Sequence, residues 1–217
     1  MTLENYVLVT GASSKLGSLI CEVLAKRKFN LLLHYYQSNT TTKLLAEKLK
    51  LKFSKQKFLP IYADLSLDYE LEDISSLIYS KSISIIGIIN NASIYNLETS
   101  ENIIGEYLEK NINIHFKNPV NLITVISKKL LSEDREGFAI NITDENLDRS
   151  NVFSYSLSKK LLSDFTNNPQ NNYMENMKII EFKPGNLLPS NNPKKAKESF
   201  KHNFEKLLQY YDGHFWG

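Results

Sequence analysis

The sequence predicts an α/β fold in which helices cover both faces of a doubly wound parallel sheet of six strands. Short apolar runs rich in β-branched residues recur along the chain, and such runs are typical of buried strands. Between them lie segments whose apolar residues are spaced three and four apart, as on one face of a helix. Because the two kinds of segment alternate, we expect the strands to be parallel.

The predicted elements follow one another without a repeat or a linker, so we expect one domain spanning residues 1–217. The Ile-rich run at residues 83–90 is typical of a strand buried on both faces of a sheet. Strands are predicted at residues 6–10, 31–36, 58–63, 83–90, 137–143 and 177–182. Helices are predicted at residues 16–28, 41–51, 69–79, 153–165 and 198–210, with a long helix within residues 106–131.

The overall composition limits the kind of protein. Because 42% of the 217 residues are hydrophobic, the chain can form one well-packed domain but not two of ordinary size. The net charge is +2 and the basic residues are scattered, so we expect no nucleic-acid or membrane partner. We see neither a signal peptide nor an apolar run of about 20 residues. With a single cysteine, Cys21, this predicts a cytoplasmic protein without disulfides, and we expect no metal site.

The first predicted strand runs directly into a turn of small residues followed by a helix, an arrangement that binds a pyrophosphate. Gly11 allows a tight turn, and Gly17 allows the helix to lie close to the strand. Lys15 adds a cation that can recognise a phosphate, although it could also be a solvated surface lysine. The predicted cofactor-binding residues of this turn are Thr10, Gly11, Ser13, Ser14, Lys15, Leu16 and Gly17.

The end of the second predicted strand indicates which dinucleotide binds. A site for NAD usually carries Asp or Glu here to bind the ribose 2′-hydroxyl, but this segment reads His-Tyr-Tyr-Gln-Ser at residues 34–38. Tyr36 and Ser38 offer neutral polar groups, and Lys15 can reach the same region. The missing carboxylate and the added cation favour the 2′-phosphate of NADP(H).

Tyr155 and Lys159 are four residues apart in a predicted helix, so their side chains share one face. A free tyrosine is a poor acid at neutral pH, and a neighbouring ammonium group stabilises the tyrosinate and lowers the pKa of the phenol. Such a tyrosine can deliver a proton as a hydride arrives from a nicotinamide. The alternative is an exposed helical Tyr–Lys pair without a function.

Together, these motifs resemble the short-chain dehydrogenase/reductase family over residues 6–188, with its Rossmann-type fold. The Thr-Gly turn, the Asn-Asn-Ala element at residues 90–92 and the Tyr-x-x-x-Lys motif carry the resemblance. It implies that Asp64 contacts the adenine, although Asp64 could also be a helix N-cap. It also implies that Lys159 holds the nicotinamide ribose. The remaining cofactor contacts that it implies are Asn91, Ala92, Pro184 and Gly185.

The lysine at position 15, where most of the family has glycine, resembles the pteridine reductases and dihydromonapterin reductases. In that subgroup Asp replaces the usual serine after the fifth strand, which implies that Asp144 acts with Tyr155; Thr143 could hold the role instead, and Asp144 could be a turn cap. The subgroup also implies that Ser93 and Tyr95 bind substrate, with Tyr95 covering a flat ring unless it is a core or lid residue.

His115 aligns with the catalytic asparagine of the family. The resemblance implies that it helps to hold a proton-relay water. Asn111 or Asn113 could serve instead if the alignment is shifted, and a buried helical histidine can also be purely structural.

Three functional hypotheses follow. The first is an NADPH-dependent reductase of a pterin or dihydropterin, with Tyr155, Lys159, Asp144 and His115 as catalytic residues. The second is a general reductase of ketone or oxoacyl substrates on the same fold, and the third is a non-catalytic NADP(H)-binding protein. The family usually carries a longer substrate loop and a seventh strand. We therefore expect a shortened C-terminal tail. The resemblance also implies a homo-oligomer of two or four subunits.

Overall fold

Six strands lie side by side and run in the same direction, in the order β3-β2-β1-β4-β5-β6. This computed structural model describes residues 4–67, 72–79, 83–98, 105–148, 151–168, 174–185 and 192–210. The order reverses between β1 and β4, which makes the sheet doubly wound and confirms the predicted fold class. The strands are β1 (Glu4–Val9), β2 (Asn30–Tyr35), β3 (Phe58–Tyr62), β4 (Ile83–Asn90), β5 (Gly137–Ile142) and β6 (Met177–Phe182).

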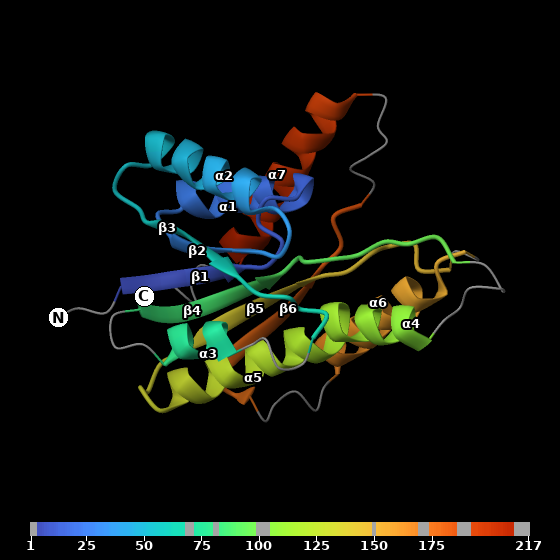
Figure 1. The fold of residues 1–217 in the computed structure, drawn as a ribbon. Helices are drawn as coiled ribbons and strands as arrows, with labels where there is room; N and C mark the ends of the chain where they lie inside the picture. Colours follow the sequence, from blue (N-terminus) through green and yellow to red (C-terminus); the bar gives the residue numbers. More distant parts are fainter. Residues whose placement is uncertain are drawn as a thin grey trace.

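The helices form one layer on each face of the sheet (Figure 1). One layer contains α1 (Lys15–Lys26), α2 (Asn39–Lys52) and α7 (Pro193–Tyr210). The other contains α3 (Glu72–Ile78), α4 (Gly105–Ile112), the short π-helix η1 (Asn113–Lys117), α5 (Asn118–Leu131) and α6 (Phe153–Asn167). Each crossover between parallel strands therefore places its helical segment over the sheet, as the alternating pattern predicts.

Two helices differ from their predicted form. α7 begins at Pro193, five residues before the predicted start, because the Asn192 side chain caps it by accepting a hydrogen bond from the Lys195 N–H (3.1 Å), and proline suits the first helical position. The long helix expected within residues 106–131 contains a π-helical segment that the spacing of apolar residues did not indicate. The first residues of the helix predicted at 69–79 lie outside the described residues.

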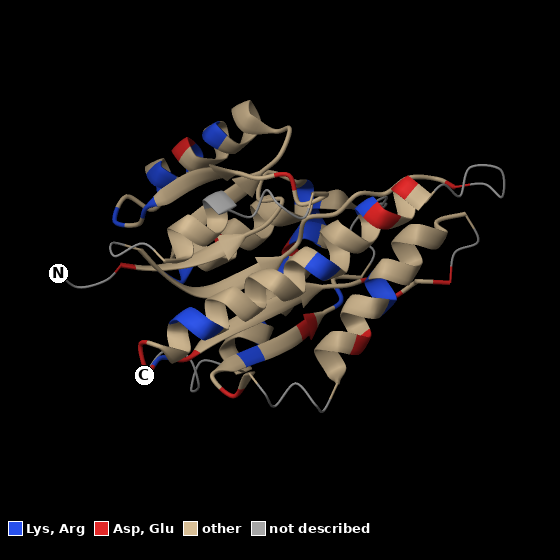
Figure 2. Ribbon diagram, turned by 60° about the horizontal axis from the view of Figure 1, so that its bottom comes forward, with Lys and Arg blue, Asp and Glu red and all other residues tan. Residues whose placement is uncertain are grey.

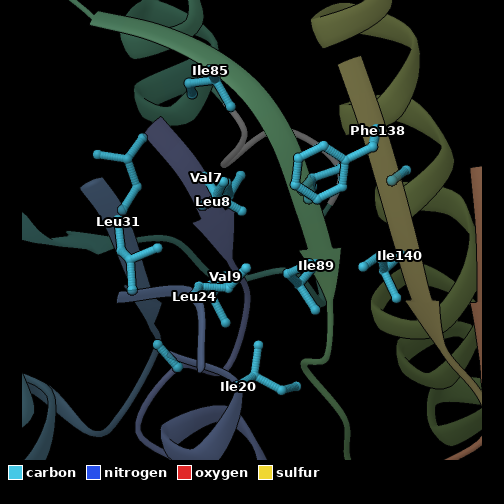
Figure 3. Close-up of a cluster of buried hydrophobic side chains, with 14 of the residues drawn as sticks. Val7, Leu8, Val9, Ile20, Leu24, Leu31, Ile85, Ile89, Phe138 and Ile140 are labelled. Atoms are coloured by element: carbon cyan, nitrogen blue, oxygen red, sulfur yellow. The ribbon is translucent and has the colours of Figure 1, made fainter. Parts of the chain in front are cut away.

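The core lies on both faces of the central strands, against α1 on one face and α5 on the other. Figure 3 shows Val7, Leu8 and Val9 of β1 together with Ile89 of β4 and Leu24 of α1. The side chains of Leu8, Val9 and Leu24 have no exposed surface, so the two middle strands are covered on both faces. This rigid centre holds the ends of β1 and β4 in fixed positions.

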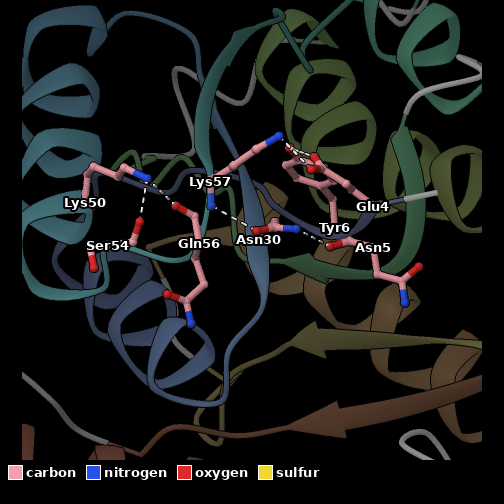
Figure 4. A network of polar contacts seen from close by, with 8 residues as sticks. All are labelled: Glu4, Asn5, Tyr6, Asn30, Lys50, Ser54, Gln56 and Lys57. Atoms are coloured by element: carbon pink, nitrogen blue, oxygen red, sulfur yellow. Dashed lines mark hydrogen bonds and ion pairs between the residues drawn. The ribbon is translucent and has the colours of Figure 1, made fainter. Parts of the chain in front are cut away.

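A polar network joins the starts of the three strands on the β3 side (Figure 4). The side chain of Asn30 accepts a hydrogen bond from the Lys57 N–H (2.9 Å) and donates to the Asn5 carbonyl (3.1 Å). Lys57 also forms an ion pair with Glu4 (2.6 Å). Pro60 lies in β3, which is an edge strand and therefore tolerates the missing N–H. The network lies at the amino ends of these strands, opposite their carboxyl ends.

Charged side chains are spread over both layers. Figure 2 shows Lys and Arg interspersed with Asp and Glu over the part of the chain that the structure describes. Among the same residues, no helix has the length and the apolar character needed to cross a bilayer.

Replacing Leu24 by alanine tests the core. We expect the free energy of unfolding to fall by about 2–5 kcal/mol, because the substitution leaves a cavity between α1 and the sheet. Leu51→Ala is the matched control, since Leu51 is also helical but 88% exposed, and we expect a change of less than about 0.5 kcal/mol. Denaturant titration followed by circular dichroism measures both, and equal losses would contradict this account of the core.

Candidate active site

A cleft of about 720 Å³ opens at the carboxyl ends of the strands. Its lining includes the ends of β1 and β4, between which the strand order reverses, and this is where ligands bind in doubly wound folds. The structure brings most of the predicted site residues into this one cleft. They are Gly11, Ser13, Ser14, Lys15, Leu16, Tyr36, Ser38, Asp64, Asn91, Ala92, Ser93, Tyr95, Asp144, Tyr155, Lys159, Pro184 and Gly185.

The turn after β1 has the shape expected of a phosphate site. Gly11 adopts a φ of +60°, and a Cβ atom there would lie 3.0 Å from the Cα of Ala92. A Cβ on Gly17 would lie 2.3 Å from the Gly11 carbonyl oxygen, so only glycine lets α1 start so close to the turn. Ser14 caps α1 by accepting a hydrogen bond from the Gly17 N–H (3.0 Å). The first N–H groups of a helix have no carbonyl partner within it, and Lys15 and Leu16 of this first turn line the cleft.

Thr10 and Asn91 hold this turn by hydrogen bonds. The Thr10 hydroxyl accepts hydrogen bonds from the N–H groups of Asn91 and Ala92 (both 2.9 Å). The Asn91 side-chain amide donates to the carbonyls of Thr10 (2.8 Å) and Gly11 (3.0 Å). Of the predicted binding residues, Thr10 and Gly17 do not line the cleft and shape the turn from within the protein, whereas Asn91 both holds the turn and lines the cleft.

His34 is a residue of this site that the sequence reasoning did not single out. Its Nδ1 accepts a hydrogen bond from the Gly11 N–H (3.1 Å), and its Nε2 lies 3.0 Å from the Ala63 carbonyl, to which it donates. Burial lowers the pKa of His34 to about 4, so the ring is neutral and keeps this arrangement at ordinary pH. His34 joins the turn after β1 to the ends of β2 and β3.

The end of β2 presents neutral groups to the cleft. Tyr36 and Ser38 are both exposed there, and Asp64 is buried beside them at the end of β3. Asp64 accepts a hydrogen bond from the Ser66 N–H (2.9 Å), so it caps a turn, whereas α3 begins only at Glu72.

The size of the cleft is within the range of small-molecule sites, and the Gly11 turn, the N–H groups of the helix start and Lys15 fit a dinucleotide. The described residues include no cluster of three His, Cys, Asp or Glu side chains that could hold a metal ion.

Tyr155, Asp144 and Lys159 meet in the floor of the cleft. The Tyr155 hydroxyl donates a hydrogen bond to Asp144 Oδ2 (3.1 Å). Lys159, one helical turn further along α6, is 3% exposed, and its Nζ donates to the Ile142 carbonyl (2.8 Å). Burial lowers the pKa of Lys159 to about 8, against the opposing effect of the nearby Asp144 carboxylate. The Tyr155 phenol, the Asp144 carboxylate and the Lys159 amine with its lowered pKa therefore share one site.

The structure decides between Asp144 and Thr143 as the partner of Tyr155. The Thr143 hydroxyl donates to Glu181 Oε1 on β6 (2.7 Å), whereas Asp144 accepts from Tyr155. The Asp144 carboxylate also accepts from the Asn146 N–H (3.1 Å), so it caps a turn as well. The contacts of Asp144 are therefore compatible both with a partner of Tyr155 and with a turn cap.

His115 is not among the residues that line the cleft, but it contacts two that are, Ser93 and Tyr155, and its place beside a proton-relay water stays a prediction. It is 1% exposed. Its Nε2 accepts hydrogen bonds from the Ile94 N–H (3.2 Å) and the Ser93 hydroxyl (2.9 Å). Its Nδ1 therefore carries the proton and donates to Ser158 Oγ (2.8 Å). Burial, with the charge of Lys159, lowers the pKa of His115 well below its usual range, so a neutral ring joins the segment after β4 to α6.

The two asparagines weighed as alternatives to His115 are directed elsewhere. The Asn111 side chain donates to the Tyr107 carbonyl and that of Asn113 to the Ser66 carbonyl, both at 2.8 Å.

The segment after β4 carries Tyr95 and Glu98 to the start of α6. The Tyr95 ring is half exposed in the cleft and meets the Tyr155 ring edge-on, with centroids 5.2 Å apart. Glu98 is 5% exposed, and its carboxylate accepts a hydrogen bond from the Ser154 N–H (2.9 Å) in the first turn of α6. The N-cap residue of α6, Val152, makes no side-chain cap, so Glu98 caps the helix from a distant part of the chain. Sequence spacing gave no signal for this contact.

Pro184 and Gly185 close the far wall of the cleft after β6. Gly185 has a φ of +67°, and a Cβ there would lie 3.9 Å from the Glu145 carboxylate. The positive φ favours glycine at this turn.

Lys159→Met tests the buried amine through the pH dependence of stability. The usual pKa of 10.5 applies to the unfolded chain and the lowered value of about 8 to the folded one. Between these values the unfolded wild type binds more protons, so its free energy of unfolding rises with pH. The methionine variant lacks this rise. We expect it to gain stability relative to wild type near neutral pH, and this gain to shrink from about pH 8 to about pH 10.5.

Denaturant midpoints measured across this pH range give the comparison for Lys159→Met. Lys160→Met removes the next lysine, which is half exposed and paired with Asp148, and controls for the loss of one positive charge. A wild-type–variant difference that does not change with pH would show that Lys159 is not held as a disfavoured cation.

Glu98→Ala tests the cap of α6. The variant leaves the Ser154 N–H without its acceptor in a buried position, and we expect a loss of about 1–3 kcal/mol in the free energy of unfolding. Glu98→Gln keeps an acceptor oxygen and is expected to lose less. Equal stability of the alanine and glutamine variants in thermal or denaturant unfolding would argue against the cap.

Comparisons with solved structures match this architecture. The FolM alternative dihydrofolate reductase 1 of Brucella canis, solved with NADP, superposes with a TM-score of 0.79 at 23% identity, over 96% of this chain and 87% of that one. A ketone-specific alcohol dehydrogenase of Comamonas testosteroni gives a TM-score of 0.76 at 19% identity, over 94% and 84%. At these identities the likeness shows the fold.

Two curated relatives match parts of the sequence. The L-xylulose reductase of Caenorhabditis elegans is 23% identical over 142 residues, which are 65% of this chain and 54% of that protein. The uncharacterized oxidoreductase YmfI of Bacillus subtilis is 38% identical over 76 residues, 35% of this chain and 31% of that protein. The matches thus span about a third to a half of these relatives. The family model described as short chain dehydrogenase matches residues 5–199, and the protein therefore belongs to the short-chain dehydrogenase family of oxidoreductases.

Proposed function

We propose that this protein is an NADPH-dependent reductase of a pterin or dihydropterin. The observation that carries the proposal is the hydrogen bond from Tyr155 to Asp144 above the buried Lys159, in the floor of a cleft that fits a dinucleotide. Tyr95 stands beside Tyr155 with half of its surface exposed to the cleft. This arrangement suits a flat heterocycle whose ring nitrogen needs a proton.

The choice of NADP(H) rests on charge. Lys15 lines the cleft at the start of α1, and the end of β2 presents Tyr36 and Ser38 where a carboxylate would repel a 2′-phosphate. The FolM structures of Brucella canis and Brucella suis were both solved with NADP, and a short-chain dehydrogenase of Sphingobium yanoikuyae with NADPH. When bound, the reduced nicotinamide supplies a hydride.

The residues of the floor supply the matching proton. Reduction of a C=N bond adds a hydride to carbon and a proton to nitrogen, and the Tyr155 hydroxyl is the group placed to give that proton. The Lys159 ammonium stabilises the tyrosinate that is left behind. Asp144, already the acceptor of the Tyr155 hydroxyl, can take up a proton from solvent and pass it to the tyrosinate. The same carboxylate can accept hydrogen bonds from the amino and ring N–H groups of a pterin.

A general carbonyl reductase is the second candidate. Tyr155 and Lys159 can protonate the oxygen of a ketone as well as a ring nitrogen, and the L-xylulose reductase and the ketone-specific alcohol dehydrogenase are similar to this chain. This reading gives no role to Asp144 in binding an amino group. The effect of replacing Asp144 therefore separates the two candidates.

The activity test follows NADPH absorbance with dihydrobiopterin, dihydromonapterin and dihydrofolate offered in parallel. We expect one of them to be reduced, and Tyr155→Phe to lower the rate by about 10²–10⁴-fold, because the proton donor is lost. Tyr79→Phe is the matched control: Tyr79 is exposed, does not line the cleft and should leave the rate unchanged.

Asp144→Ala completes the activity test. Pterin reduction that survives both Asp144→Ala and Tyr155→Phe at the wild-type rate would rule out the proposed mechanism. Turnover of ketones but no pterin would favour the general carbonyl reductase. Tight NADPH binding without turnover of either class would favour a non-catalytic cofactor-binding protein.

A further inference from the structure

Helix α7 lies beside α1 on one face of the sheet (Figure 1), and two ion pairs set how the two helices align. Lys26 of α1 pairs with Glu205 of α7 (2.9 Å), and Glu22 of α1 pairs with Lys201 of α7. The second pair lies four residues before the first in both helices. The helices therefore run in the same direction, with residues 22 and 26 level with residues 201 and 205.

One helical turn further back, this alignment brings Lys197 level with Ser18, beside the first turn of α1. One such step of four residues is about 6 Å along a helix. A lysine side chain is about as long, so Lys197 can reach the first turn of α1. Consistent with this, Lys197 lines the same cleft as Lys15 and Leu19 of α1. A residue far along the sequence thus reaches the turn where the structure fits a pyrophosphate.

Lys197 is available to bind an anion. Its side chain is exposed, and it forms no hydrogen bond or ion pair with any other residue that the structure describes, whereas Lys201 is engaged by Glu22. Its backbone is well fixed, because Phe200 and Phe204 pack against Phe182 with ring centroids 5.7 and 5.2 Å apart. Because the helix is anchored, only the Lys197 side chain has to become ordered when a ligand binds.

Few other cations are available for the cofactor phosphates. The described lysines that line the cleft are Lys15, Lys159 and Lys197, and Lys159 is buried against the Ile142 carbonyl at the catalytic end. A pyrophosphate bound at the start of α1 would carry two negative charges near Lys15. Those charges would also attract Lys197, which lines the same cleft.

We propose that Lys197 is a second phosphate-binding residue, which contacts the pyrophosphate of the dinucleotide from α7. The proposal rests on the proposed binding of NADP(H). Lys197 is assigned to the pyrophosphate because it lies level with the first turn of α1. The 2′-phosphate, by contrast, is expected at the end of β2, near Ser38. NADPH and NADH share the pyrophosphate and differ in the 2′-phosphate.

Calorimetric titration of Lys197→Ala with NADPH and with NADH tests the assignment. We expect Kd to rise by roughly five- to tenfold for both nucleotides, as for the loss of one partly solvated charge contact. The effect should shrink at high salt, because exposed charges are screened. Lys197→Arg should restore most of the affinity.

Lys194→Ala is the matched control. Lys194 lies one turn earlier on α7, is also exposed and does not line the cleft. The control therefore removes the same charge from the same helix without removing the contact, and we expect it to bind both nucleotides nearly as wild type does.

The possible outcomes separate this inference from the proposed function. Wild type that binds neither nucleotide would overturn both. Wild type that binds, with Lys197→Ala and Lys194→Ala indistinguishable, would overturn the inference alone. A loss confined to NADPH would overturn the assignment to the pyrophosphate and transfer Lys197 to the 2′-phosphate.

Discussion

The hydroxyl of Thr10 bridges the two central strands at the point where they separate. It accepts the N–H groups of Asn91 and Ala92 and donates to the Ile89 carbonyl (3.2 Å). The Thr10 N–H donates to the same Ile89 carbonyl (3.0 Å), so the backbone and the side chain of one residue both hold the end of β1 against β4. The bridge keeps β4 close while the chain after β1 turns away into α1. The phosphate turn and the Tyr95 segment both start from this junction, and their spacing depends on it.

Around this junction the protein uses buried polar side chains as connections between elements. His34 joins the turn after β1 to β3, His115 joins the segment after β4 to α6, and Glu98 caps α6 from a distance. Each of these side chains has several hydrogen bonds or a helix terminus to compensate for its burial. Lys159 is different, because its ammonium is buried, donates to the Ile142 carbonyl, and is disfavoured more by burial than it is favoured by the nearby Asp144 carboxylate. A charge kept in such a place is typical of a site shaped for chemistry.

The sequence predicted the parts of the protein that depend on local spacing. Short segments encode the Thr10–Gly17 turn by its glycine positions, the pair Tyr155 and Lys159 by a four-residue spacing, and the six strands by apolar runs rich in β-branched residues. Residues whose roles arise from contacts distant in sequence were missed or misplaced. Nothing near Glu98 in the sequence indicates a cap for α6, and His34 was noticed only as part of a neutral segment. The start of α7 at Asn192–Pro193 was missed because the stretch before residue 198 is polar. His115 was singled out by resemblance, which gave no indication of its hydrogen bonds to Ile94 and Ser158.

The π-helical segment η1 limits how this part of the chain can change. A π turn contains one residue more than the α turn it replaces, so Asn113–Lys117 acts as a one-residue insertion within an otherwise continuous helix. Deleting one residue there would convert the π turn into an ordinary α turn and leave α4 and α5 in line. Asn118, in α5, would keep its hydrogen bond to the Leu65 carbonyl (2.8 Å), whereas His115, inside the π turn, would change direction and lose Ser158. A relative with one residue fewer in this segment is therefore expected to have replaced the His115 connection by another contact.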